Sequence, residues 1–134
     1  MLELAFEYYG LVVLLSTSTI QLASSYRSLK GVTFIPNPKL NCALALVIML
    51  PCLAALATWN WRNPVGIIEG AQQFYLFMLG IISAVGLTII ISSLVNHSRF
   101  KNTVAPLVPG FESLNQKTYF QALSESLRKI KWRG

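Results

Sequence analysis

The sequence predicts an all-α integral membrane protein with three transmembrane helices and a C-terminal amphipathic helix on the inner face of the membrane. Of its 134 residues, 54% are hydrophobic and only 12% are charged, against about 25% charged in an ordinary soluble domain. The apolar residues gather in three runs long enough to cross the roughly 30 Å core of a bilayer as helices. A membrane β-barrel would need many short alternating segments, and none is visible.

The first apolar run, about residues 8–26, is predicted to be a retained span. Glu3 and Glu7 precede it, whereas a cleavable signal peptide begins with positive charge. Its polar residues share one helix face, where we expect them to meet another helix, since interhelical hydrogen bonds and close contact drive helix association in lipid. These packing residues are Thr17, Gln21 and Ser24.

The second run, about residues 40–59, follows a connection with two prolines, Pro36 and Pro38, which favour extended backbone. Its polarity is predicted to be slight, limited to Cys42, Cys52 and Thr58. In a helix the two thiols would lie about 15 Å apart, too far for a disulfide.

The third run, about residues 71–96, carries a small or hydroxylated residue at every fourth position. Such a stripe lets a partner backbone approach closely. Two alternatives remain open: the stripe packs against a helix of the same chain, or it meets another subunit. The stripe residues are Gly80, Ala84, Thr88 and Ser92.

Positive charge near the span ends predicts the orientation, because cytoplasmic connections carry an excess of Lys and Arg. Three cations stand in the first connection, Arg62 alone in the second, and the rest follow the third span. We therefore expect the N-terminus outside and the C-terminus inside, in a bacterial inner membrane or an organellar membrane. Residues 1–101 would form the membrane region and residues 102–134 an inner tail.

The tail contains a second periodic pattern. Four apolar residues recur at three- and four-residue steps, as on one face of a helix, and cations occupy the other faces. This face is expected to dock either on anionic lipid of the inner leaflet or on a partner subunit. The docking residues are Phe120, Leu123, Leu127 and Ile130.

Residues suited to catalysis are few. His97 is the single histidine. It is a candidate for binding haem or chlorophyll, although the simpler interpretation is an interfacial residue at a helix C-terminus, where positive charge is favoured. No catalytic triad, phosphate loop or metal-ligand motif is recognisable. We therefore expect no enzyme activity, no catalytic residue, no metal, no cofactor and no nucleic-acid partner; a bound lipid or pigment stays open.

These observations favour a non-catalytic structural or accessory subunit of a larger membrane complex, with other membrane proteins and anionic lipids as partners. Two alternatives belong to other classes: a self-assembling small pore or transporter of the holin kind, and a pigment- or lipid-binding subunit. A pore needs a polar face across the whole bilayer, which the second span lacks.

Overall fold

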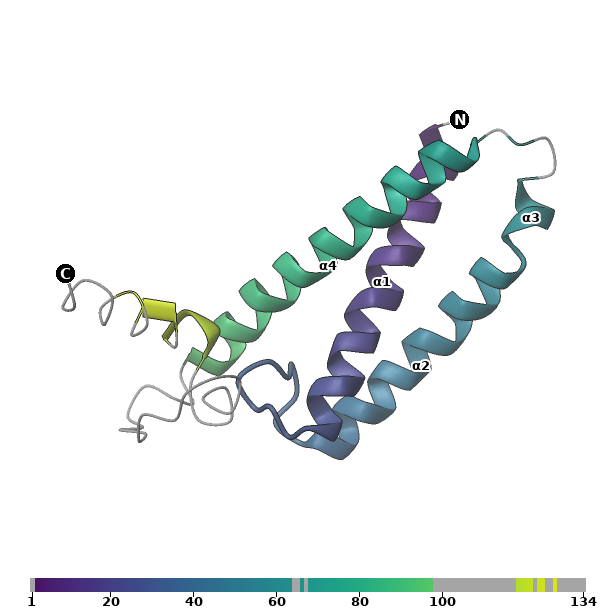
Figure 1. The fold of residues 1–134 in the computed structure, drawn as a ribbon. Coiled ribbons are helices and arrows are strands. Elements are labelled where there is room, and N and C mark those ends of the chain that lie inside the picture. The colour runs from purple at the N-terminus through teal and green to yellow at the C-terminus, as the bar shows by residue number, and fades with distance from the viewer. Residues whose placement is uncertain are drawn as a thin grey trace.

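The computed structural model describes residues 2–63, 66, 68–97, 118–121, 123, 124 and 127. Its elements are α1 (Leu2–Tyr26), α2 (Pro38–Ala57), the short α3 (Trp59–Arg62) and α4 (Gly70–His97). In the described part of the chain the regular structure is helical throughout, with no strand. Residues 119–121, 123, 124 and 127 also have helical backbone and lie beside the C-terminal end of α4 (Figure 1).

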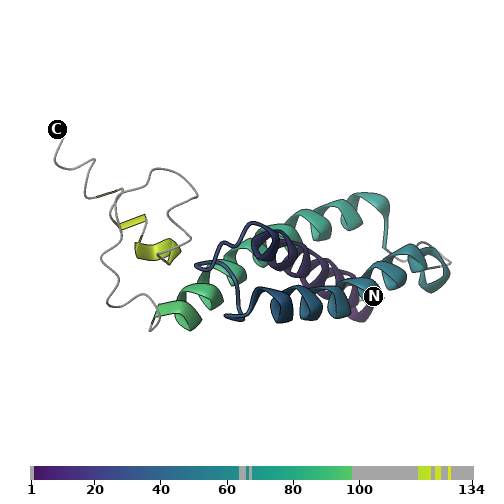
Figure 2. The same ribbon diagram turned by 90° about the horizontal axis from the view of Figure 1, so that it is seen from below.

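The three long helices form an open layer with α1 in the middle. Helix α1 packs against both α2 and α4, whereas α2 and α4 do not contact each other. Viewed from below, α1 lies between its two neighbours (Figure 2). The fold therefore has two seams: the α1–α4 seam and the α1–α2 seam.

Two of these helices, α2 and α4, are long and apolar enough to cross a membrane. They cover the second and third predicted spans, with bounds that differ by one or two residues. The first predicted span, 8–26, lies inside α1, which begins earlier, at Leu2. Polar residues make α1 less apolar than α2 and α4, and α1 is not among the helices found to be long and apolar enough to cross a membrane.

Local chemistry explains the ends of α1 and α2. Ser28 has a φ of 55°, and two hydrogen bonds close the turn: Ser28 N–H to Ser25 O at 3.2 Å and Leu29 N–H to Ser24 O at 2.9 Å. This is a Schellman motif, in which a left-handed residue ends a helix. At the start of α2, the Asn37 side chain caps the helix by accepting from Lys39 N–H at 3.0 Å.

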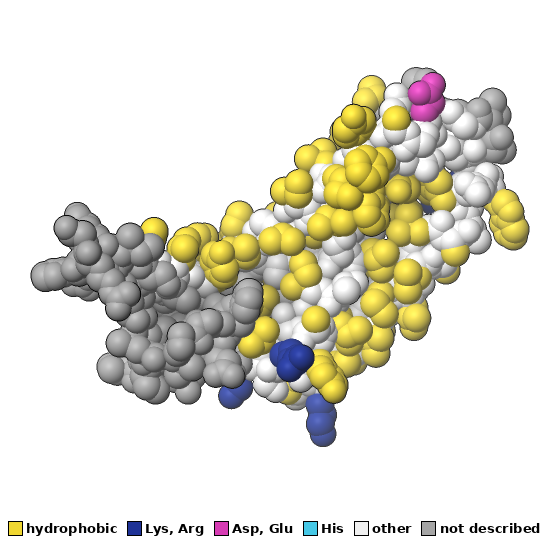
Figure 3. All heavy atoms as spheres, viewed as in Figure 1, with side chains coloured by type: hydrophobic (Ala, Val, Ile, Leu, Met, Phe, Trp, Pro, Cys, Tyr) yellow, Lys and Arg dark blue, Asp and Glu magenta, His cyan; other side chains and the backbone are white. Residues whose placement is uncertain are grey.

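Charge is divided between the two ends of the layer. Arg27, Lys30 and Lys39 lie where α1 ends and α2 begins, which we call the loop end. Glu3 and Glu7 lie at the start of α1 and Glu69 just before α4, at the opposite end, where Arg62 is paired with Glu7. Figure 3 shows basic side chains at the loop end, an acidic side chain at the opposite end, and hydrophobic side chains along the helices between.

Candidate functional site

The predicted small-residue stripe of α4 is buried inside this chain. Gly80, Ala84, Thr88 and Ser92 are all buried, and Ala84 and Ser92 have an exposed fraction of 0%. A Cβ atom placed on Gly80 would lie only 2.7 Å from Cγ1 of Val12 on α1. Of the two alternatives left open by the sequence, the structure places the stripe against a helix of the same chain, along the α1–α4 seam.

The polar residues predicted on the first span have different surroundings. Thr17 is half-buried, whereas Gln21 and Ser24 are buried. Gln21 contacts α2 directly: Asn41 Nδ2 donates to its side-chain Oε1 at 3.1 Å and to its backbone oxygen at 3.2 Å. The same nitrogen lies 2.8 Å from Ser25 Oγ, whose hydroxyl donates to Gln21 O at 2.8 Å.

These side chains also hold the loop between α1 and α2. Gln21 Nε2 donates to Val32 O at 3.1 Å, and Phe34 N–H donates back to Gln21 Oε1 at 3.0 Å. Asn41 Oδ1 accepts from Ile35 N–H at 3.2 Å. We call Gln21, Ser25 and Asn41, which are joined by hydrogen bonds, together with Asn96, which binds the same loop, the amide cluster.

Helix α4 joins the amide cluster through Asn96. Its Nδ2 donates to Thr33 O at 2.8 Å and to Ser92 O at 2.9 Å. Asn96 has an exposed fraction of 0% and Asn41 of 1%. The loop is therefore fixed by polar side chains from all three long helices, which satisfy backbone groups that would otherwise be buried without partners.

Asn41, Asn96 and Ser25 drew no expectation from the sequence. The polar residues predicted for the second span are Cys42, Cys52 and Thr58, and Asn41 is not among them. A signal was nevertheless present, because an asparagine within an apolar span is costly unless it faces a partner. What the sequence could not supply was the partner, since backbone groups of an irregular loop leave no residue pattern.

At the end opposite the loop, other contacts close the layer. Tyr9 Oη donates to Ser83 Oγ at 2.8 Å, which joins α1 to α4. Arg62 and Glu7 form an ion pair at 2.8 Å, about half exposed. The ring centroids of Tyr8 and Trp59 lie 5.1 Å apart. Trp59 is 4% exposed.

Buried polar atoms without a partner are rare among the described residues. They are Thr88 Oγ1 and Ser93 Oγ on α4, and Trp59 Nε1. Within the same part of the chain, no group of three His, Cys, Asp or Glu side chains could hold a metal ion. Cys42 and Cys52 are free thiols.

His97 is exposed at the end of α4. It lines a cavity of about 360 Å³ together with Ser93 and Leu94 of α4 and Thr118 and Gln121 of the tail. Of the predicted docking residues of the tail, Phe120, Leu123 and Leu127 are 51%, 42% and 59% exposed. Ile130 lies outside the described residues.

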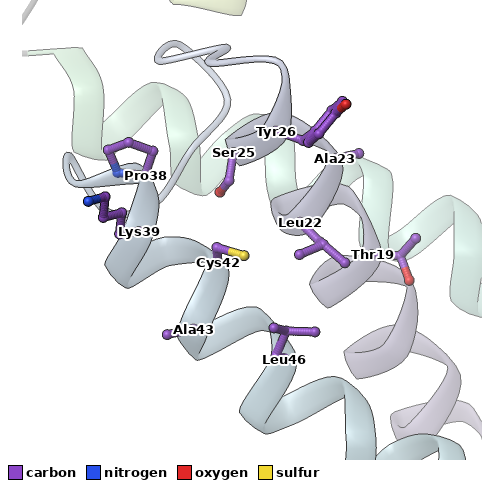
Figure 4. Close-up of a pocket in the computed structure, with 10 residues that line it drawn as sticks. All are labelled: Thr19, Leu22, Ala23, Ser25, Tyr26, Pro38, Lys39, Cys42, Ala43 and Leu46. Carbon is purple, nitrogen blue, oxygen red and sulfur yellow. The ribbon is translucent and has the colours of Figure 1, made fainter.

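A larger open groove runs along the α1–α2 seam near the loop end, with a volume of about 830 Å³. Its walls are almost wholly apolar. Figure 4 shows Leu22 of α1 and Cys42 and Leu46 of α2 pointing toward one another across it, while Tyr26 and Lys39 stand at its loop end. The arrangement offers a hydrophobic slot with the cation Lys39 among its lining residues at the loop end, its amine nitrogen directed away from Leu22 (Figure 4). Against protein-family models, curated proteins and solved structures, the chain gave no match.

Proposed function

We propose that the chain is a non-catalytic structural or accessory subunit of a membrane protein complex, with three spans. The open layer carries this proposal. Of the long helices, α2 and α4 each contact only α1, and just 17% of the most apolar 18-residue window of each is buried within the chain. Wide apolar faces on both sides of the layer thus remain available to lipid and to neighbouring helices.

The burial of the polar residues of α1 supports this helix as a span in addition to α2 and α4. Its 25 residues give a length of about 37 Å, enough for the hydrocarbon core. Ser18, Gln21, Ser24 and Ser25 are buried, so their polar groups are kept from lipid. A helix that is too polar for lipid by itself is thus compatible with the middle of the layer.

The proposed orientation places the loop end inside and the N-terminus outside. Arg27, Lys30 and Lys39 at the loop end have no carboxylate beside them among the described residues. Arg62, the single cation of the second connection, is paired with Glu7. Three cations at the loop end against one in the second connection favour this orientation, because the count of Lys and Arg near the span ends sets it.

Single-cysteine labelling of intact cells tests the orientation, in a background without Cys42 and Cys52. An impermeant thiol reagent should modify a cysteine at Asn63 and leave one at Asn37 unmodified. Labelling of Asn37 with protection of Asn63 would reverse the orientation.

Extraction in a gentle detergent tests the subunit proposal itself. The chain should migrate with larger, unrelated membrane proteins that mass spectrometry identifies in fixed proportion. A homo-oligomer with ion conductance in planar bilayers would favour the pore alternative, and a visible absorption band in the purified fraction would favour pigment binding. The stripe of α4 faces α1 and therefore could not line a pore without rearrangement.

The exposed face of the tail gives a second test of assembly. The double variant Leu123→Glu with Leu127→Glu places two carboxylates on this face. It should release the tail from the membrane or from a partner, because burying a carboxylate is costly. Limited proteolysis should then cut the tail faster, by about tenfold. Ser124→Glu is the matched control, since Ser124 is exposed and polar. Unchanged proteolysis and assembly of the double variant would mean that the tail docks on nothing.

A further inference from the structure

We propose that the groove between α1 and α2 binds one acyl chain of an anionic glycerophospholipid, with the phosphate group beside Lys39. This inference goes beyond the proposed function, on which it rests only in that the chain lies in a bilayer. It names a ligand site in the open groove that the α1–α2 seam leaves near the loop end.

The dimensions of the groove fit an acyl chain. Its volume of about 830 Å³ falls in the usual range of small-molecule sites, roughly 300–1,000 Å³. It extends along α2 from Pro38 to Leu46, which corresponds to about 12 Å of helix. The hydrocarbon depth of one leaflet is about 15 Å, so a chain of that leaflet can lie along most of the groove.

The walls of the groove are suited to methylene groups and to no polar ligand. Leu22, Cys42 and Leu46 converge on it (Figure 4). The one buried hydroxyl in the wall, that of Ser25, is occupied, because it donates to Gln21 O and accepts from Asn41. Dispersion contacts would therefore supply the binding energy within the groove.

Charge complementarity selects the headgroup. Lys39 stands at the loop end of the groove, in the first turn of α2, where the helix dipole also favours an anion. Arg27 and Lys30 lie at the same end, and the described carboxylates lie at the opposite one (Figure 3). A zwitterionic headgroup would add its own cationic group to these three cations, so an anionic lipid is preferred.

Native mass spectrometry of the whole chain tests the proposal. The chain is reconstituted in vesicles with equal amounts of phosphatidylglycerol and phosphatidylcholine of identical acyl chains, and is then released from gentle detergent. One phosphatidylglycerol should remain on each chain, at least fivefold above phosphatidylcholine. Loss of both lipids, or equal retention of both, would overturn the proposal, as would a dimer that carries no lipid.

Two pairs of variants assign the lipid to this groove. Lys39→Gln should lower the preference for phosphatidylglycerol about fivefold, corresponding to about 1 kcal/mol per lysine at an anionic membrane surface. Lys30→Gln, also at the loop end but outside the groove, should lower it less than twofold. Equal effects of the two changes would mean general surface attraction rather than a site.

Cys42→Trp fills the groove and should reduce lipid retention at least fivefold. Val47→Trp is its control, because Val47 is 68% exposed on the same helix and does not line the groove. Circular dichroism and monodispersity identify any variant that fails to fold, in which case the lysine pair decides. Because retention is measured on the purified chain, a failure to find partner subunits would leave this result unaffected.

Discussion

The two seams of the layer are built differently, although they share α1. The α1–α4 seam relies on close contact: Gly80 leaves no room for a Cβ beside Val12, and Ala84 is completely buried. The α1–α2 seam relies on hydrogen bonds at its loop end, where Asn41 meets Gln21 and Ser25, and beside them it leaves a groove. Added volume should therefore disrupt the first seam, and lost polarity the second.

The largest effect is expected for Ala84→Leu in the α1–α4 seam. Three extra carbon atoms at a position with no exposed surface must push α1 and α4 apart, which should cost about 2–3 kcal/mol. The free energy of unfolding is measured by circular dichroism in mixed micelles of increasing denaturing-detergent content. Val85→Leu is the control, because Val85 is 44% exposed and should be tolerated. Equal tolerance of both changes would mean that volume does not limit this seam.

Asn41→Leu should be next, with a loss of about 2 kcal/mol. The isosteric apolar side chain leaves Ile35 N–H without its acceptor and Gln21 Oε1 without one of its donors, and buried unsatisfied groups cost about 1–3 kcal/mol each. Proteolysis within the loop 27–37 should accelerate at the same time. Asn60→Leu, at an exposed position, should do neither. Normal loop protection in Asn41→Leu would refute the role given to the amide cluster.

A pair of glycine changes sharpens the steric part of the comparison. Gly80→Ala should cost about 1 kcal/mol net, because the new Cβ meets Val12, a β-branched residue with little freedom to move. Gly86→Ala, on the same helix with nothing within 4 Å, should gain up to about 1 kcal/mol from helix propensity. The same unfolding assay compares them. A gain in both variants would show that the backbones can separate without cost.

The smallest effect concerns the turn that begins the α1–α2 connection. Ser28→Gly should stabilise the chain by about 1 kcal/mol, since Ser28 has a φ of 55° and glycine adopts this conformation without penalty. Arg27→Gly, one residue earlier, has no positive φ to relieve and should be neutral or destabilising. Stabilisation by both changes would point to general loop flexibility instead.

Helix positions were more predictable than helix neighbours. Length and apolarity located α2 and α4 within two residues, because the bilayer thickness fixes how long an apolar helix must be. The small-residue stripe indicated a close contact, but a spacing of four cannot say which helix provides it. The amide cluster was harder still: Gln21 was identified as a packing residue, whereas Asn41 and Asn96 gain their meaning from the fold of the loop.

The groove could not be foreseen at all. Its walls are ordinary apolar residues such as Leu22 and Leu46, which would look the same in a sequence if they faced lipid or filled a core. The space exists only because α1 and α2 are placed side by side in the fold. The tail stayed a sequence-based prediction, since its stripe ends at Ile130, outside the described residues.

The position of α1 as the only shared neighbour also sets an order of assembly during synthesis. Helices α1 and α2 are joined by a short loop, and their contacts, including that of Asn41 with Gln21, form between residues close in the chain. Such local contacts close quickly, whereas those of α4, such as Tyr9 with Ser83, must wait for a segment made much later. The hairpin of α1 and α2 can thus be complete when α4 emerges. Asn96 at the end of α4 then binds Thr33 O, so the last residues of the bundle to leave the ribosome are those that lock its first loop.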